Sequence, residues 1–176
     1  MSAIPETMRI GIVLERCAID NPWQSHVWRV VATIPGAPEI PAPIMLREGP
    51  GWTQYHAATL TLELHRRETE GYKRNLANET PAVYVILRTD DEADEMPRAD
   101  LATVCPYEAQ DYLDGGGVDE SVEMTAMPEA VRAWLADYVA AWHVDEAFKK
   151  RKRKNWKRGE PHSERQPRGS TRQRHG

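Results

Sequence analysis

One run of residues has enough positive charge to neutralise several phosphate groups. Residues 149–158 are KKRKRKNWKR, in which eight of ten residues are Lys or Arg. Such a run with one aromatic residue suits nucleic acid, because cations neutralise phosphates and a Trp ring stacks on bases. It equally suits docking on an acidic protein surface, or a solvated extension without a specific partner. The residues concerned are Lys149, Lys150, Arg151, Lys152, Arg153, Lys154, Trp156, Lys157 and Arg158.

A second group of charged residues lies between Leu64 and Leu76, where the sequence is LHRRETEGYKRNL. The segment holds three Arg, one Lys, one His, two Glu and one Asn, and it is basic at both ends. Because Arg binds carboxylates and phosphates through two parallel hydrogen bonds, the segment is a candidate recognition surface. The alternative is a helix whose charged residues pair with one another in solvent, where such pairs contribute little.

No segment has the residue pattern of a familiar catalytic, cofactor or metal site. The three glycines at 115–117 lack the Lys and hydroxyl of a phosphate-binding loop and stand among acidic residues, so we predict a flexible turn. Cys17 and Cys105 lack the paired spacing of a zinc or iron–sulfur site. We therefore predict no catalytic residue, metal or cofactor, and an enzymatic role stays open. The histidines considered as metal ligands, and set aside for lack of spacing, are His56, His65 and His143.

Charge divides the chain into two parts. The 176 residues have a net charge of -4. Residues 149–176 hold 12 Lys and Arg against two Glu, whereas residues 1–148 hold 11 Lys and Arg against 25 Asp and Glu. We predict one acidic domain over residues 1–148 and a disordered basic tail over 149–176, because the tail has too few apolar side chains to offset the entropy of ordering.

The sequence also bears on the compartment. The N-terminal residues lack a basic stretch followed by an apolar run, and no window approaches ~18 consecutive apolar residues. Two cysteines without paired spacing fit a reducing environment. We expect a cytoplasmic protein that does not insert into a membrane.

Strands form most of the framework that positions these groups. Branched and aromatic residues predict an antiparallel hairpin from residues 8–19 and 26–34. Alternation on the second strand directs Trp28, Val30, Ala32 and Ile34 toward the core. Residues 81–88 are the most apolar segment and are predicted to be a central strand. Further strands are predicted at residues 44–47, 51–65, 101–105 and 118–125, the last at an edge.

Three helices complete the prediction. Residues 68–78 have acidic groups early and basic groups late, as the helix dipole favours, and residues 106–114 have Pro in the first turn. Residues 128–143 form the clearest helix, because apolar side chains recur at steps of three and four. We predict an α+β domain in which a mostly antiparallel sheet of about five to seven strands packs against this long C-terminal helix. The apolar stripe comprises Met127, Val131, Trp134, Leu135, Tyr138 and Trp142.

Three segments carry a family resemblance. The segments LERCAIDNPWQSHVWRVVATIPG, ETEGYKRNLANETPAVYVILR and CPYEAQDYLDGG resemble the bacterial family labelled domain of unknown function 3305, over about residues 10–154. The resemblance implies a role in assembling or regulating molybdenum-dependent formate dehydrogenases, beside whose genes this family is typically encoded. Some relatives have been labelled molybdenum-cofactor nucleotide-transfer proteins, but the Leu-Ala-Gly-Gly loop of such enzymes does not follow the first predicted strand here.

Three hypotheses about function follow. The first is a non-catalytic accessory protein that binds a formate dehydrogenase subunit or a maturation factor of that enzyme. The second is a nucleic-acid-binding protein that uses the basic tail, and the third is a carrier or enzyme related to the molybdenum cofactor. The candidate partner-binding residues, taken from the family-like segments, are Trp23, Arg29, Tyr72, Arg74, Asn75, Tyr107 and Gln110.

Overall fold

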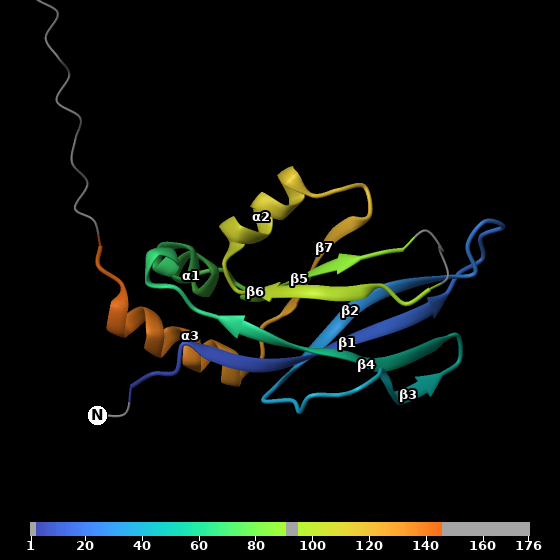
Figure 1. Ribbon diagram of the computed structural model, residues 1–176, viewed down its shortest axis with the longest axis horizontal. Helices are drawn as coiled ribbons and strands as arrows, with labels where there is room; N and C mark the ends of the chain where they lie inside the picture. The colour runs from blue at the N-terminus through green and yellow to red at the C-terminus, as the bar shows by residue number, and fades with distance from the viewer. Residues whose placement is uncertain (1–2, 91–94, 146–176) are drawn as a thin grey trace, which may run out of the picture. The chain divides into compact units, whose positions relative to one another are not determined.

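A computed structural model describes residues 3–90 and 95–145, in a compact unit that ends at Val144 (Figure 1). The described residues form two antiparallel sheets and three α-helices. The four-stranded sheet has the order β2-β1-β4-β3, and the three-stranded sheet has the order β6-β5-β7. The strands are β1 (Thr7–Ala18), β2 (His26–Pro35), β3 (Ile44–Gly49), β4 (Trp52–Glu63), β5 (Ala82–Arg88), β6 (Arg98–Thr103) and β7 (Glu120–Ala126). The helices are α1 (Thr69–Leu76), which follows a 3-10 turn (Arg66–Glu68), α2 (Pro106–Gly115) and α3 (Glu129–Trp142).

The α+β class and the antiparallel pairing are confirmed, but the prediction of one sheet of about five to seven strands packed against a long C-terminal helix is wrong. Alternation shows which face of a strand is buried, but it does not identify the neighbouring strand. β2 lies beside β7, and β4 lies beside β6, without joining the two sheets into one. Where β2 meets β7, the backbone N–H of Val30 donates instead to the carboxylate of Glu123, at 2.9 Å. The strands therefore divide into two sheets.

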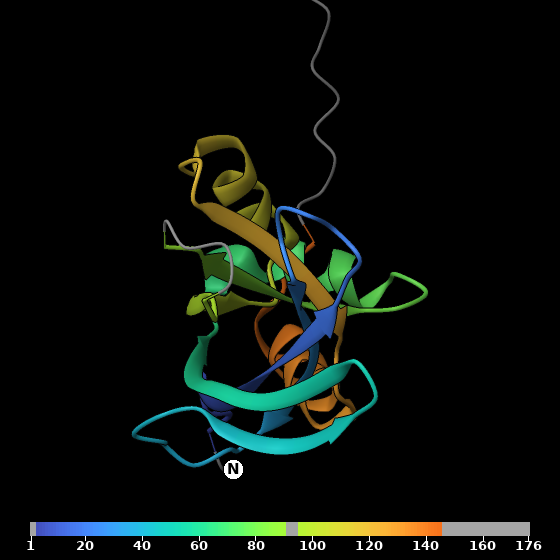
Figure 2. The same cartoon turned by 90° about the vertical axis from the view of Figure 1, so that its right-hand side faces the viewer.

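The two sheets and α3 share one hydrophobic core. Ile10, Ile12 and Leu14 of β1 are fully buried, and Val83 and Val85 of β5 belong to the same cluster. Figure 1 shows α3, in orange, beside α1 at one end of the two sheets, and Figure 2 gives the view along the sheets from their other end. The arrangement explains why β1 and β5 are nearly continuous apolar runs, since the shared interior covers them.

The C-terminal helix α3 buries most of its predicted stripe. Trp134 and Tyr138 are both buried, and each donates a hydrogen bond to the backbone just outside the four-stranded sheet, before β1 or after β4. The Trp134 Nε1 donates to the Pro5 carbonyl at 2.7 Å, and the Tyr138 hydroxyl donates to the Leu64 carbonyl at 3.3 Å. Trp142 is 40% exposed. In the described part of the chain, no helix has the length and apolar content needed to cross a membrane.

A β-bulge corrects the predicted inner face of β2. Val30 is buried as predicted, but Ala32 and Ile34 are exposed while Thr33 is buried. β2 pairs Val30 with Leu14 and Ala32 with Val13, so Val31 is an extra residue between the two pairs. One extra residue reverses the direction of every side chain after it, which is why simple alternation fails beyond Val30.

The other element boundaries agree closely with the sequence predictions. β5 is the central strand of its sheet, β7 is an edge strand, and α2 begins at Pro106. β6, however, begins at Arg98 rather than at residue 101. Its first residues are polar, yet they pair with β5, and the carboxylate of Asp100 lies 3.0 Å from the Nε of Arg88.

Candidate partner-binding surface

Asn75 joins α1 to the start of β5 and to the end of β6. Its side-chain Nδ2 donates to the carbonyls of Ala82 and Val104, both at 2.8 Å, and its Oδ1 accepts the N–H of Ala82 at 3.0 Å. Asn75 is fully buried. Because a buried amide that makes three hydrogen bonds has one allowed position, these bonds fix α1 against the three-stranded sheet.

A glycine allows α1 to approach α2. A Cβ at Gly71 would lie 2.7 Å from the Sγ of Cys105 and 3.0 Å from the ring of Tyr107. Cys105 directly precedes α2 and is buried, and this burial raises the pKa of its thiol. The two helices are therefore in close contact near the start of α2, and they lie side by side in Figure 1.

Tyr72 fills the space beneath α1. It is fully buried, and burial raises the pKa of its hydroxyl above the usual value. The hydroxyl accepts the backbone N–H of His65 at 3.0 Å and donates to the carboxylate of Glu68 at 3.1 Å. Tyr72 also packs edge-on against Tyr138 of α3, with ring centroids 6.3 Å apart. These contacts hold α1 between β4 and α3.

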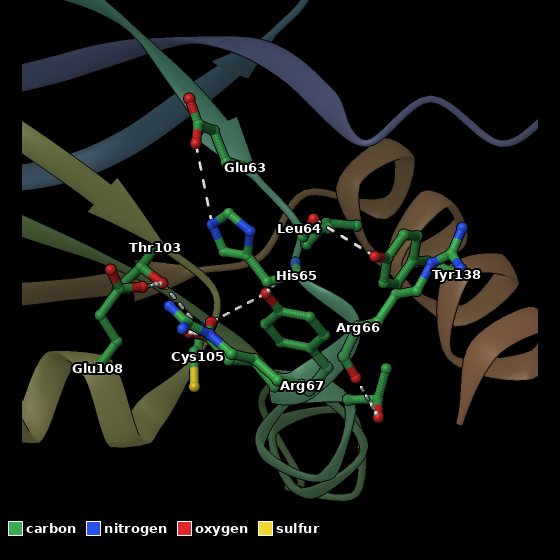
Figure 3. Close-up of polar contacts among 12 residues, drawn as sticks. Glu63, Leu64, His65, Arg66, Arg67, Thr103, Cys105, Glu108 and Tyr138 are labelled. Carbon is green, nitrogen blue, oxygen red and sulfur yellow. Dashed lines mark hydrogen bonds and ion pairs between the residues drawn. The ribbon is translucent and has the colours of Figure 1, made fainter. Parts of the chain in front are cut away.

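Figure 3 shows the junction at which β4, α1 and α2 meet. The side chain of His65 extends toward Glu63, with 3.9 Å between Nε2 and Oε2. The Thr103 hydroxyl donates to Glu108 at 2.5 Å and accepts the N–H of Cys105 at 3.0 Å, which fixes the first turn of α2. The junction is thus a rigid base from which both helices present their outer side chains.

The outer side chains of α1 and α2 form what we call the α1–α2 surface, defined by Arg74, Tyr107, Gln110, Asp111 and Leu113. All five residues are exposed. Tyr107 and Leu113 are 47% and 59% exposed, and only Ala109 of α2 is buried. Tyr107 and Leu113 lie near opposite ends of α2, and large apolar residues left exposed on a firmly held helix are a feature of protein-binding surfaces.

The seven candidate residues fall into three groups. Arg74 on α1 and Tyr107 and Gln110 on α2 are exposed on two neighbouring helices, and the Nε2 of Gln110 donates to Asp114 at 2.9 Å. Trp23 and Arg29 are exposed on the four-stranded sheet and its β1–β2 loop, and Figure 1 places that loop at the opposite end of the sheets from α1.

Tyr72 and Asn75 form the third group, and both are fully buried. Their hydrogen bonds support the surface from below, and they offer no side-chain atoms to a partner. The nine tail residues from Lys149 to Arg158 lie outside the described residues.

Sequence reasoning missed two members of the surface, Asp111 and Leu113. Ala109, Tyr112 and Leu113 have the three-and-four spacing of a buried stripe, which hides the fact that Leu113 is exposed. The charge of the surrounding sequence could have indicated that Asp111 belongs to an acidic surface, because residues 99–131 contain eight Asp and Glu and no Lys or Arg. Such a bias predicts an acidic surface wherever the segment is exposed.

Some of the charge pairing predicted as the alternative for the segment from Leu64 to Leu76 is present, and its recognition role stays a prediction. Some of its charges are paired, since Arg67 lies 3.8 Å from Glu68 and Arg66 lies 4.0 Å from Glu6. The guanidinium of Arg66 also lies 3.5 Å from the ring centroid of Trp142, so it covers the exposed end of the α3 stripe.

A small polar hollow lies between β4 and β6. Its volume is 220 Å³, and the polar groups that line it include Glu63, His65, Asp100 and Glu108. Asp100 lies 2.5 Å from Arg98, and this Arg98 hydrogen bond lowers the pKa of the Asp100 carboxyl. In residues 3–90 and 95–145, no three His, Cys, Asp or Glu side chains are arranged to hold a metal ion. The firmly held α1–α2 surface is therefore the stronger candidate site.

Comparison with known proteins gives one match. No curated protein and no solved structure matches the chain. The family described as protein of unknown function (DUF3305) matches residues 9–152, which include every element of both sheets and all three helices except the first two residues of β1. The chain therefore belongs to the DUF3305 family of proteins of unknown function.

Proposed function

We propose that this protein is a cytoplasmic, non-catalytic accessory protein that binds another protein through the α1–α2 surface. The observation that supports this proposal is the exposure of Tyr107 and Leu113 on a helix whose base is fixed by buried hydrogen bonds. A rigid helix loses little conformational entropy on binding. Covering apolar side chains that are exposed in the free protein lowers the free energy of the complex.

The charge of this surface limits the kind of partner. Asp111 and Asp114 are exposed beside Leu113, and the whole segment from 99 to 131 lacks basic residues. A complementary surface would place Lys or Arg around an apolar pocket, because opposite charges speed association and exclude like-charged competitors. Arg74, at the edge of the surface, would then face an acidic group of the partner.

The resemblance described above suggests the identity of this partner. We propose a subunit of a bacterial molybdenum-dependent formate dehydrogenase, or one of the maturation factors of that enzyme. An accessory protein needs a firm docking surface rather than a set of reacting groups, and the α1–α2 surface meets that requirement.

The basic tail supports a second candidate, nucleic-acid binding. Eight of the ten residues from 149 to 158 are Lys or Arg, and Trp156 would stack on a base. The net charge of residues 1–148 opposes this function, since 25 acidic residues against 11 basic ones repel a polyanion.

Affinity capture from the native cells separates these candidates. Tagged full-length protein should recover formate dehydrogenase subunits or maturation factors, as identified by mass spectrometry. The Leu113→Ala variant should recover at least about tenfold less of them, because the substitution removes a large exposed apolar contact from the surface. Leu46→Ala is the matched control, since Leu46 is 48% exposed on β3 of the four-stranded sheet. Recovery of ribosomes and nucleic acid alone, in a tail-dependent manner, would refute the accessory function and favour the second candidate.

A further inference from the structure

A second hollow lies at the far end of the four-stranded sheet from α1. It has a volume of 470 Å³ and is partly open to solvent. Its floor is formed by the paired ends of β1 and β4, and its lining includes Arg16, His26 and Trp52. The backbone N–H of Ala18 donates to the Gly51 carbonyl at 2.8 Å, which closes the floor beyond the last ladder pair.

Trp52 is a fixed wall of this hollow. A Cβ at Gly49 would lie 2.6 Å from the Trp52 ring, so the ring packs directly on the glycine backbone. The guanidinium of Arg47 lies 5.9 Å from the ring centroid. Gly51, with φ of 78°, provides the left-handed residue that the β3–β4 turn needs. The sequence REGPGW thus builds a turn that holds an aromatic ring in place.

The one permanently charged side chain that lines the hollow is that of Arg16. None of its lining residues is Asp or Glu. The guanidinium of Arg16 is exposed and has no ion pair or hydrogen bond with any residue in the described ranges. The ring of His26 stands edge-on to Trp28, with centroids 5.7 Å apart, and its Nδ1 lies 2.8 Å from the Ser25 hydroxyl. An exposed Arg that bonds to none of the described residues, beside a held aromatic ring, suits a carboxylate ligand.

Trp23 is close in sequence to a residue that lines the hollow. It precedes Ser25 by two residues in the β1–β2 loop, and it is 90% exposed. The side chain of Asn21 accepts the backbone N–H of Trp23 at 2.9 Å, which orders the loop at this point. Trp and Arg are the residue types that contribute most at protein interfaces, and here they occur together on two adjacent hairpins.

We propose that this hollow, formed by Arg16, His26 and Trp52, binds an acidic segment of a partner protein, with Trp23 covering an apolar residue of that segment. Arg16 binds the carboxylate. Because the hollow is partly open to solvent, an extended protein segment fits it better than a small molecule, which is usually enclosed on most sides. The charge of residues 1–148 disfavours nucleic acid, whereas a short acidic segment meets chiefly the local cations.

This site is distinct from the α1–α2 surface in position and in charge. The α1–α2 surface calls for a cationic partner, and the hollow calls for an anionic one. A protein that has both sites can bind a cationic surface and an anionic segment at the same time. This property suits an accessory protein that brings together two chains, or two parts of one chain.

The test is fluorescence anisotropy with a short fluorescein-labelled peptide of Glu and Tyr residues. The basic tail would bind the same peptide, so every variant is made in the full chain with the eight Lys and Arg of residues 149–158 changed to Gln. Arg16→Gln should weaken binding by about tenfold or more, the usual effect of removing one charged hydrogen bond. Trp23→Ala should weaken binding severalfold.

Arg9→Gln is the matched control, because Arg9 is exposed on the same strand and its substitution changes the net charge equally. It should alter the affinity by no more than about twofold, as expected for charge alone at physiological salt. Equal losses for Arg16→Gln and Arg9→Gln would overturn the proposal, and so would parent binding weaker than about 1 mM. Leu113→Ala should leave peptide affinity unchanged, so failure of the α1–α2 proposal is detected separately by affinity capture.

Discussion

Replacing Asn75 by Ala tests whether this residue supports the fold or binds a partner. The substitution removes three hydrogen bonds of 2.8, 2.8 and 3.0 Å. Each bond contributes about 1 kcal/mol net, and the N–H and carbonyl of Ala82 and the carbonyl of Val104 would remain buried without those partners. Ala82 and Val104 are only 7% and 1% exposed, so water replaces the lost bonds poorly. We therefore expect a loss of about 3 to 5 kcal/mol, a large share of the ~5–15 kcal/mol that stabilises an ordinary domain.

Urea unfolding followed by circular dichroism measures this loss. With an m-value of about 2 kcal/mol/M, the midpoint should fall by roughly 1.5 to 2.5 M. Asn78→Ala is the control, because Asn78 is exposed just beyond the same helix and should change the stability by less than about 0.5 kcal/mol. A loss for Asn75→Ala no greater than that of Asn78→Ala would refute the structural role.

Asn75→Asp sharpens the same experiment. An ionised Asp would keep an acceptor for the Ala82 N–H but would direct a carboxylate oxygen at two carbonyls. The variant should therefore be less stable than Asn75→Ala at neutral pH. Its stability should recover partly as the pH falls, since a protonated carboxyl can again donate. Stability that is independent of pH would contradict this account.

Two further predictions concern the packing around α1. Gly71→Ala should lower the melting temperature, because overpacking against Cys105 costs about 1 to 3 kcal/mol and outweighs a gain in helix propensity of about 1 kcal/mol. Adding Cys105→Ala should restore part of the lost stability. A Gly71→Ala variant that is more stable than the parent would refute the close contact. Burial raises the folded-state pKa of Tyr72 above the ordinary value of 10.0, so the folded protein holds this proton more tightly than the unfolded chain does. The contribution of Tyr72 to stability is complete below pH 10 and should be lost as the pH rises further. Ultraviolet difference spectra should then show tyrosinate from Tyr72 appearing only with unfolding, a coupling that Tyr72→Phe should remove.

Local patterns predicted most of the secondary structure. β1 and β5 are nearly continuous apolar runs, α3 has a clear spacing of three and four, and α2 begins at the proline that marks it. These signals depend on neighbouring residues in the chain, so the sequence contains them completely. These local patterns could not predict the number of sheets, because that number depends on which strands become neighbours. It also depends on the hydrogen bond from the Val30 N–H of β2 to the carboxylate of Glu123.

The candidate site shows the same division. Sequence alone identified the segments that hold Arg74, Tyr107 and Gln110, and it established the contrast between an acidic chain and a basic end. It did not separate Asn75, a polar residue that is fully buried, from Trp23, an aromatic residue that is 90% exposed. Residue type predicts burial only on average, because a buried amide is stable wherever the fold supplies its hydrogen-bond partners. Those partners come from β5 and from the end of β6, and only the tertiary structure brings them to Asn75.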